Sequence, residues 1–269
     1  MSASHRNRTP ALFLPYLAVP PADTLTLLTS TLSCTCNWLT ARFIGAALQS
    51  DDFPGSVVLV SWLHDTSFWR GEIQRATGID AFRSSSNFTF LDCLSDAPTP
   101  PQSSVLAETQ KRIFQAIGSA SADRKVLLIL DTPTLLFSLA PETISSDLNR
   151  MLLALRDHER MHSTILALPS DLPYVSAATP NADHVPTPLE TAHAGFTMQQ
   201  VHLARLVLGC RELDTGAARD VSGVLRITKG GGWDDGGDDG NGEQQLAEEL
   251  KEGQWRYLIG RDGSVKIVE

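Results

Sequence analysis

Residues 125–131 read KVLLILD, five apolar residues in a row between a lysine and an aspartate. The stretch 55–62, GSVVLVSW, has the same character and is rich in β-branched side chains. A strand with one solvent-exposed face alternates apolar and polar residues, whereas a strand buried on both faces is apolar throughout. Both stretches therefore predict inner strands of a parallel sheet that helices cover on its two faces.

Outward from these strands, short β-type runs alternate with segments of helical periodicity. In residues 37–48, for example, apolar positions 39, 43, 44, 47 and 48 form one stripe. We expect strands at 24–28, 55–62, 88–92, 125–131 and 164–168, and helices at 37–48, 65–77, 104–117, 144–158 and 189–203. This alternation predicts an α/β domain with a mostly parallel sheet.

The C-terminal part is β-rich and lacks long helices. Strands are expected at 206–208, 224–228, 257–259 and 265–268. The last two are separated by Gly260-Arg261-Asp262-Gly263, and Asp-Gly between apolar runs predicts a hairpin. We expect these strands to extend the same sheet in antiparallel fashion.

The sequence divides into an irregular, proline-rich segment, 1–22, and one domain, 23–269. A proline-rich loop is expected at 93–103, and another loop with four prolines before residue 189. Residues 230–253 hold eight acidic residues and one lysine, so they account for −7 of the net charge of −9. Such a stretch is expected to be a flexible insert, with 230–242 a disordered loop. The rest of the chain is nearly neutral and has no global basic signature for nucleic acid, which leaves a local patch open.

None of the cysteines, Cys34, Cys36, Cys93 and Cys210, forms a C-x-x-C pair. A chain with this much core needs no disulfides, so free, mostly buried thiols in a reducing compartment are expected. No apolar run is long enough for a bilayer span or a signal peptide, and we expect no membrane association.

The first strand–loop–helix junction is where phosphate binds in many such folds. The phosphate-loop pattern G-x-x-x-x-G-K-[ST] fits residues 30–37 without gaps. Its glycine positions are Ser30 and Thr35, its lysine position is Cys36, and its hydroxyl position is Asn37. All four defining residues are missing, and a β-branched threonine is costly wherever φ must be positive. The pattern predicts a lost phosphate site without catalytic residues or cofactor.

Asp131 ends the strand 127–131 as a Walker B aspartate would, where it would hold Mg²⁺ through water. A turn or capping aspartate before Thr132 explains it as well. Asp80, Asp92 and Asp131 could gather at strand ends, although their spacing does not establish this.

His158-Glu159-Arg160-Met161-His162 matches the zinc motif H-E-x-x-H. The helix is expected to end there, and no third ligand follows at a usual spacing, so we predict no metal site.

The most basic part of the domain comprises Arg205, Arg211, Arg219, Arg226 and Lys229. These side chains could contact RNA phosphates or a neighbouring subunit. The alternative is a solvated sheet edge with ion pairs to Glu212, Asp214 and Asp220.

Three stretches carry a resemblance to a known family: VVLVSWLHDTSFW at 57–69, MLLALR at 151–156 followed by HST at 162–164, and LDTGAARDVSGVLRITKGG at 213–231. Together they resemble the Elongator subunit 6 family of fungi. The resemblance implies a RecA-like fold without a working phosphate loop. It implies a heterohexameric ring with Elongator subunits 4 and 5, which works with the remaining Elongator subunits in modifying the wobble uridine of tRNA in cytoplasm and nucleus. It also implies that the ring binds tRNA and that this subunit is no enzyme by itself; an NTPase with an unusual phosphate loop is the alternative.

Overall fold

The computed structural model describes residues 9–84, 87–95, 105–120, 123–177, 185–216, 218–234 and 250–268. Its centre is one nine-stranded sheet with the order β3-β2-β4-β5-β1-β6-β7-β8-β9. The strands are β1 Leu25–Ser30, β2 Ser56–Ser61, β3 Phe88–Asp92, β4 Val126–Asp131, β5 Met161–Pro169, β6 Leu206–Arg211, β7 Gly223–Lys229, β8 Gly253–Ile259 and β9 Val265–Val268. Strands β1 to β6 are parallel and β7 to β9 are antiparallel to their neighbours, as the sequence predicts.

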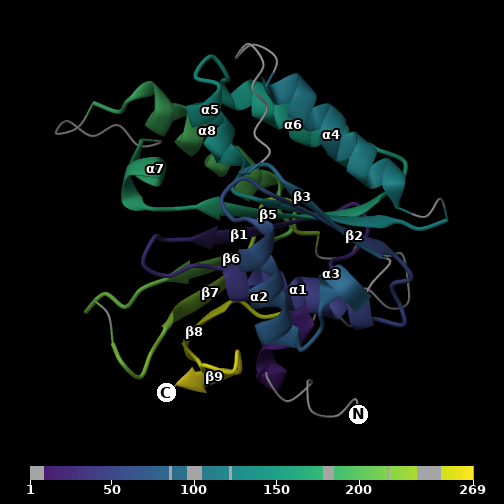
Figure 1. Ribbon diagram of the computed structural model, residues 1–269. Coiled ribbons are helices and arrows are strands. Elements are labelled where there is room, and N and C mark those ends of the chain that lie inside the picture. The colour runs from purple at the N-terminus through teal and green to yellow at the C-terminus, as the bar shows by residue number, and fades with distance from the viewer. Residues whose placement is uncertain are drawn as a thin grey trace.

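Helices cover both faces of the parallel part of the sheet (Figure 1). They are α1 Asn37–Gln49, α2 Thr66–Thr77, α3 Ala81–Ser84, α4 Val105–Ser119, α5 Leu136–Leu139, α6 Ser145–Arg156, α7 Leu172–Ser176 and α8 Pro188–Leu203. Helices α1, α2 and α3 lie on one face, and α4, α5, α6 and α8 lie on the other.

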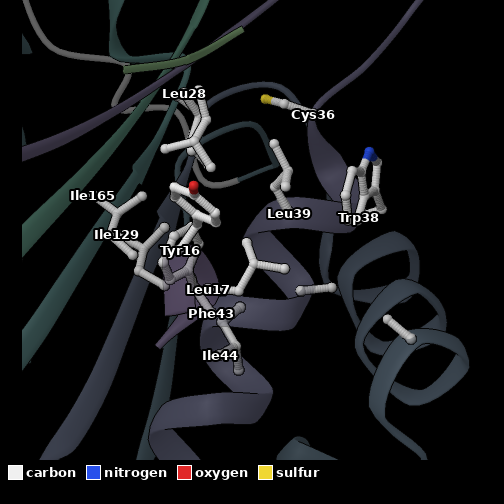
Figure 2. Packing of buried hydrophobic residues seen from close by; sticks show 14 of the residues in the cluster. Tyr16, Leu17, Leu28, Cys36, Trp38, Leu39, Phe43, Ile44, Ile129 and Ile165 are labelled. Atoms are coloured by element: carbon white, nitrogen blue, oxygen red, sulfur yellow. The ribbon is translucent and has the colours of Figure 1, made fainter. Parts of the chain in front are cut away.

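Strand β4, which lies within the apolar stretch 125–131, shows why this arrangement forms. Its six residues are all buried. Leu127 and Ile129 pack in the core beneath α1 and α2, while Leu128 and Leu130 pack in the core beneath α4 to α8. Because successive side chains of a strand point to opposite faces, an unbroken apolar run requires a helical layer on each side. Figure 2 shows the first core, where Ile129 and Ile165 of the sheet face Phe43 and Ile44 of α1.

Two predicted boundaries around residue 160 differ from the structure. The helix predicted to reach residue 158 ends at Arg156, and the strand predicted at 164–168 begins already at Met161. β5 lies between β4 and β1, so Met161 and Ser163 are buried and paired in the sheet. Short helix α7 lies in a stretch predicted to be a loop.

The N-terminal segment is packed against the domain over its described part, residues 9–22. It contains two 3-10 turns, Ala11–Phe13 and Pro15–Leu17. The Phe13 ring is fully buried and meets Trp255 of β8 edge-on, with ring centroids 5.8 Å apart. The Tyr16 hydroxyl donates a 2.7 Å hydrogen bond to the carbonyl of Lys251. Apolar side chains thus bind this proline-rich segment to the C-terminal strands.

The expectation of a disordered loop from residue 230 is wrong for residues 230–234. The backbone N–H of Gly230 donates to the Arg205 carbonyl, and those of Gly231 and Gly232 donate to carbonyls near the end of α8. A Cβ at Gly231 would lie 2.5 Å from the His202 carbonyl oxygen, so only glycine allows this close approach. The glycines therefore satisfy carbonyls that a helix end leaves without partners. Residues 235–249 of the acidic stretch, and 96–104 after β3, lie outside the described residues.

Among the helices that the structure describes, none combines the length and hydropathy that crossing a bilayer requires.

Candidate functional site

The loop between β1 and α1 lies at the carboxyl ends of the parallel strands, where open α/β sheets bind ligands. Ser30 is the last residue of β1, and α1 begins at Asn37. Cys36 stands at the N-cap of α1, and its side chain makes no capping hydrogen bond. The alignment of residues 30–37 with a phosphate loop is thus geometrically sound: strand, loop and helix begin and end where the pattern requires.

The backbone of this loop is folded on itself. The Cys34 N–H donates a 3.0 Å hydrogen bond to the Thr31 carbonyl, and the two residues form an isolated antiparallel bridge. Positive φ occurs at Asp23, Thr132, Gly78, Gly216 and Gly263 among the described residues, and so nowhere between residues 30 and 37. The strain expected at Thr35 does not arise. Because an anion-binding nest needs a residue in the left-handed region, this loop also lacks such a nest.

An acidic side chain occupies the outer side of the loop. The Leu32 N–H donates a 3.0 Å hydrogen bond to Oδ1 of Asp171. Asp171 arrives there because β5 pairs with β1 as far as Pro169 and Ser30, after which the Ser170 N–H donates to the Ser30 carbonyl at 2.7 Å. A carboxylate hydrogen-bonded to the loop N–H would repel a phosphate at the same position. Sequence reasoning missed Asp171, since it lies 139 positions from Leu32.

The residue at the lysine position is an uncharged, buried thiol. Cys36 is 3% exposed, and burial raises the pKa of its thiol to about 12. Figure 2 shows its sulfur directed from the start of α1 toward the strand that carries Leu28. Burial also raises the pKa of the Cys34 and Cys210 thiols, so both are neutral at physiological pH.

An aromatic group closes the inner side of the loop. The Tyr257 hydroxyl of β8 lies 3.2 Å from the Cys34 sulfur, and its ring lies 5.1 Å from that of Trp38. The interior behind the loop thus contains thiols and aromatic rings, and residues 30–37 contain no cation that could bind a phosphate.

Asp131 ends β4, and both of its carboxylate oxygens are engaged. Oδ2 accepts a 2.7 Å hydrogen bond from the Ser61 hydroxyl and lies 3.1 Å from Nδ1 of His64. Oδ1 accepts a 3.0 Å hydrogen bond from the Thr132 hydroxyl. Thr132 itself has φ 58°, an uncommon value for a β-branched residue. Asp131 therefore acts as an internal hydrogen-bond acceptor, which favours the structural interpretation over a magnesium ligand.

Sequence reasoning missed Ser61 and His64 as partners of Asp131. Both lie within the stretch 57–69. Ser61 belongs to the predicted strand 55–62 and His64 follows it, but strand order is not evident from sequence, so their contact with Asp131 could not be predicted. The His64 ring also stacks on Phe68 with centroids 3.9 Å apart, which fixes its orientation.

The other candidate metal residues do not come together. Asp92 Oδ1 accepts hydrogen bonds from the N–H groups of Leu94 and Ser95, and Asp80 precedes β3 with its carboxylate 4.0 Å from Arg70. Within the described ranges, no group of three or more His, Cys, Asp or Glu side chains could hold a metal ion.

The H-E-x-x-H motif is divided between a turn and a strand. His158 lies in the turn after α6, where its Nδ1 accepts from the Arg160 N–H at 3.1 Å. His162 lies in β5 and packs edge-on against Phe53, with ring centroids 4.8 Å apart. The two imidazoles therefore have separate surroundings, as expected for a helix that ends before the second histidine.

The basic cluster separates into different environments. Arg205 and Lys229 each lie over the Trp233 ring, 4.3 Å from its centroid. Arg211 forms a 2.5 Å ion pair with Asp214. Arg219 is exposed in the β6–β7 connection, and Arg226 is exposed on β7. The predicted pairing with nearby acids is thus seen for Arg211, whereas Arg226 is on an open sheet face.

Comparison with known proteins identifies the fold. No family model matches the chain, and no curated protein matches it. Among solved structures, it is similar to a KaiC-like protein from the hyperthermophilic archaeon Pyrococcus horikoshii OT3, with a TM-score of 0.57 and 14% sequence identity. The match covers 98% of this chain and 97% of the other. The chain therefore has a RecA-like α/β fold, and a likeness at this level of identity establishes the fold alone.

Proposed function

We propose that this chain is a non-catalytic subunit of a ring-shaped assembly, in which the RecA-like domain is a building block and not an ATPase. The observation that carries the proposal is the closed loop after β1. Its Leu32 N–H is held by Asp171, and its lysine position is the buried Cys36. Such a loop offers a triphosphate neither a backbone nest nor a cation, which are the two features that bind it in phosphate loops.

The particular assembly is proposed from the resemblance of residues 57–69 and 213–231 to Elongator subunit 6. In this proposal the chain assembles with Elongator subunits 4 and 5, two copies of each, into a heterohexamer. The ring binds tRNA and supports wobble-uridine modification together with the remaining Elongator subunits, in cytoplasm and nucleus. A heterologous ring needs two different faces on each subunit, and an asymmetric α/β domain supplies them.

Light scattering tests this proposal. The mass of the purified chain is measured alone and after mixing with subunits 4 and 5. We expect a discrete species of hexameric mass in the complete mixture and in neither the chain alone nor the mixture of the two partners. A chain that keeps its own mass in the mixture would refute the proposed assembly.

The alternative is an NTPase with an unusual phosphate loop, and the RecA-like fold with Asp131 at the end of β4 favours it. Calorimetry of the isolated chain with Mg-ATP separates the two functions. We expect no saturable heat up to millimolar nucleotide. Binding that Asp131→Asn abolishes, and that the matched strand-end variant Asp92→Asn retains, would establish the alternative instead.

A further inference from the structure

The antiparallel strands present one face that helices α4 to α8 leave open. Register places Val224 opposite both Arg211 and Arg256, and Arg226 opposite both Gly209 and Gln254. Directly paired residues share a face of the sheet. On β9, Lys266 lies opposite Leu258 and belongs to the same face. We call this surface, with Arg211, Arg226, Arg256 and Lys266 as its charged residues, the basic sheet face.

Burial differs between the two faces of these strands, although Val224 of the basic sheet face is only 2% exposed. Leu225, Ile227, Tyr257 and Val265 alternate with the residues of the basic sheet face and are buried in the core. Arg226, Gln254, Arg256 and Lys266 are exposed. In Figure 1, β7, β8 and β9 lie well away from α4, α6 and α8, the helices on that side of the sheet. No described element therefore covers the basic sheet face at these positions, and it can contact a partner.

The charges that these strands contribute to this face are all of one sign. Strands β6 to β9 contain no aspartate or glutamate, and their cations on this face are Arg211, Arg226, Arg256 and Lys266. In the part of the chain that the structure describes, the side chains of Arg226, Arg256 and Lys266 have no ion-pair or hydrogen-bond partner. Arg211 is paired with Asp214, whose side chain is 88% exposed. Concentrated positive charge on a chain of net charge −9 indicates a polyanionic partner.

The spacing of these cations suits a chain of phosphates. Arg226 and Arg256 are diagonal neighbours on adjacent strands, and so are Arg256 and Lys266. Diagonal neighbours lie roughly 7–8 Å apart, so each cation can contact its own phosphate. Gly209 and Gln254 flank Arg226 and add no charge. Arginine also donates two parallel hydrogen bonds to one phosphate.

We propose that the basic sheet face, through Arg226, Arg256 and Lys266, binds the phosphate backbone of RNA. The inference rests on the proposed function, in which the assembly handles RNA, and it adds the surface that does so. Arg205 and Lys229 are not part of this surface, because both lie over the Trp233 ring, which packs against the core on the opposite face of the strands.

The test compares two triple variants of the full chain with equal change in charge. Arg226→Gln, Arg256→Gln and Lys266→Gln remove the basic sheet face. Lys111→Gln, Arg150→Gln and Arg83→Gln, on α4, α6 and α3, are the matched control. Binding of fluorescein-labelled bulk tRNA and of a 20-nucleotide oligouridylate is measured by anisotropy from 50 to 200 mM salt. Each chain is measured alone and in the assembly with subunits 4 and 5.

We expect the first variant to bind at least tenfold more weakly at 100 mM salt and the control to bind like wild type. The slope of log K against log salt concentration should decrease by about 2, since each lost contact to a single strand removes about 0.7. A variant that assembles and binds RNA with unchanged affinity and slope overturns the inference and leaves the proposed function standing. A folded variant that no longer joins the assembly also overturns it, because the face is then a protein interface. Failure of the wild-type chain to assemble refutes the proposed function, and the RNA affinities of the chain alone then decide the inference.

Discussion

Acidification should destabilise this protein through one buried histidine. His193 of α8 is 4% exposed, its ring stacks on Tyr174 with centroids 4.3 Å apart, and its buried Nε2 has no hydrogen-bond partner among the described residues. Burial lowers the pKa of His193 to about 4. In the unfolded chain the pKa of a histidine is about 6.5.

The sign and size of the effect follow from these two pKa values. Between pH 6.5 and 4 the unfolded chain binds a proton that the native chain does not, so the free energy of unfolding decreases as pH falls. One pKa unit corresponds to about 1.4 kcal/mol, so the native state loses about 2 kcal/mol from this group between pH 7 and pH 5. Above pH 6.5 both states are neutral at this position, and the group has no effect.

Urea unfolding followed by tryptophan fluorescence at pH 7 and pH 5 measures this loss. His193→Phe keeps an aromatic ring against Tyr174 and cannot titrate, so its free energy of unfolding should decrease by about 2 kcal/mol less than that of wild type. Comparison with wild type cancels all other titrating groups, such as His162, whose pKa is also lowered by burial. His202→Phe, at an exposed position of the same helix, is the control for replacing a histidine by phenylalanine. Equal losses in wild type and His193→Phe would refute the reasoning.

Three further predictions concern the loop after β1, the glycines that contact the end of α8, and the buried cysteines. Cys36→Lys restores the lysine of the phosphate-loop pattern but buries an ammonium group, so the free energy of unfolding should decrease by about 3 kcal/mol or more. Calorimetry of this variant should show no Mg-ATP binding. A gain of nucleotide binding would contradict the closed conformation of the loop. Gly231→Ala places a Cβ 2.5 Å from the His202 carbonyl oxygen, so it should lower the free energy of unfolding by roughly 1–3 kcal/mol in urea. Gly71→Ala, in α2 with open space around it, should raise that free energy by roughly 0.5–1 kcal/mol. Equal effects of the two variants would show that the close approach at Gly231 is unimportant. Alkylation by iodoacetamide, read by mass spectrometry, should be slow in the native protein and fast in denaturant, and rapid native labelling would contradict the burial of Cys34, Cys36, Cys93 and Cys210.

Local sequence determined the fold class because burial of a parallel strand on both faces leaves a local pattern. The apolar runs of β2 and β4 and the stripe of α1 predicted a covered parallel sheet, and the Asp262-Gly263 turn predicted the last hairpin; both are confirmed. The absence of the defining phosphate-loop residues from positions 30–37 was equally evident, because that motif is a short local sequence. Helix and strand ends near residue 160 were not, because burial of Met161 between neighbouring strands depends on the sheet.

Only the tertiary structure decided which distant residues meet. The order of the strands brings Asp171 to the Leu32 N–H, and it brings Ser61 and His64 to Asp131. Register joins Arg256 to Arg226 on one face, while the glycines after β7 fold onto α8 and place Trp233 under Arg205 and Lys229. Strand order and register result from packing summed over the whole core, so no short stretch of sequence contains them. The sequence by itself thus determined that residues 30–37 lack the glycines and the lysine of a phosphate loop, and the tertiary structure decided that Asp171 and Tyr257 contact this loop.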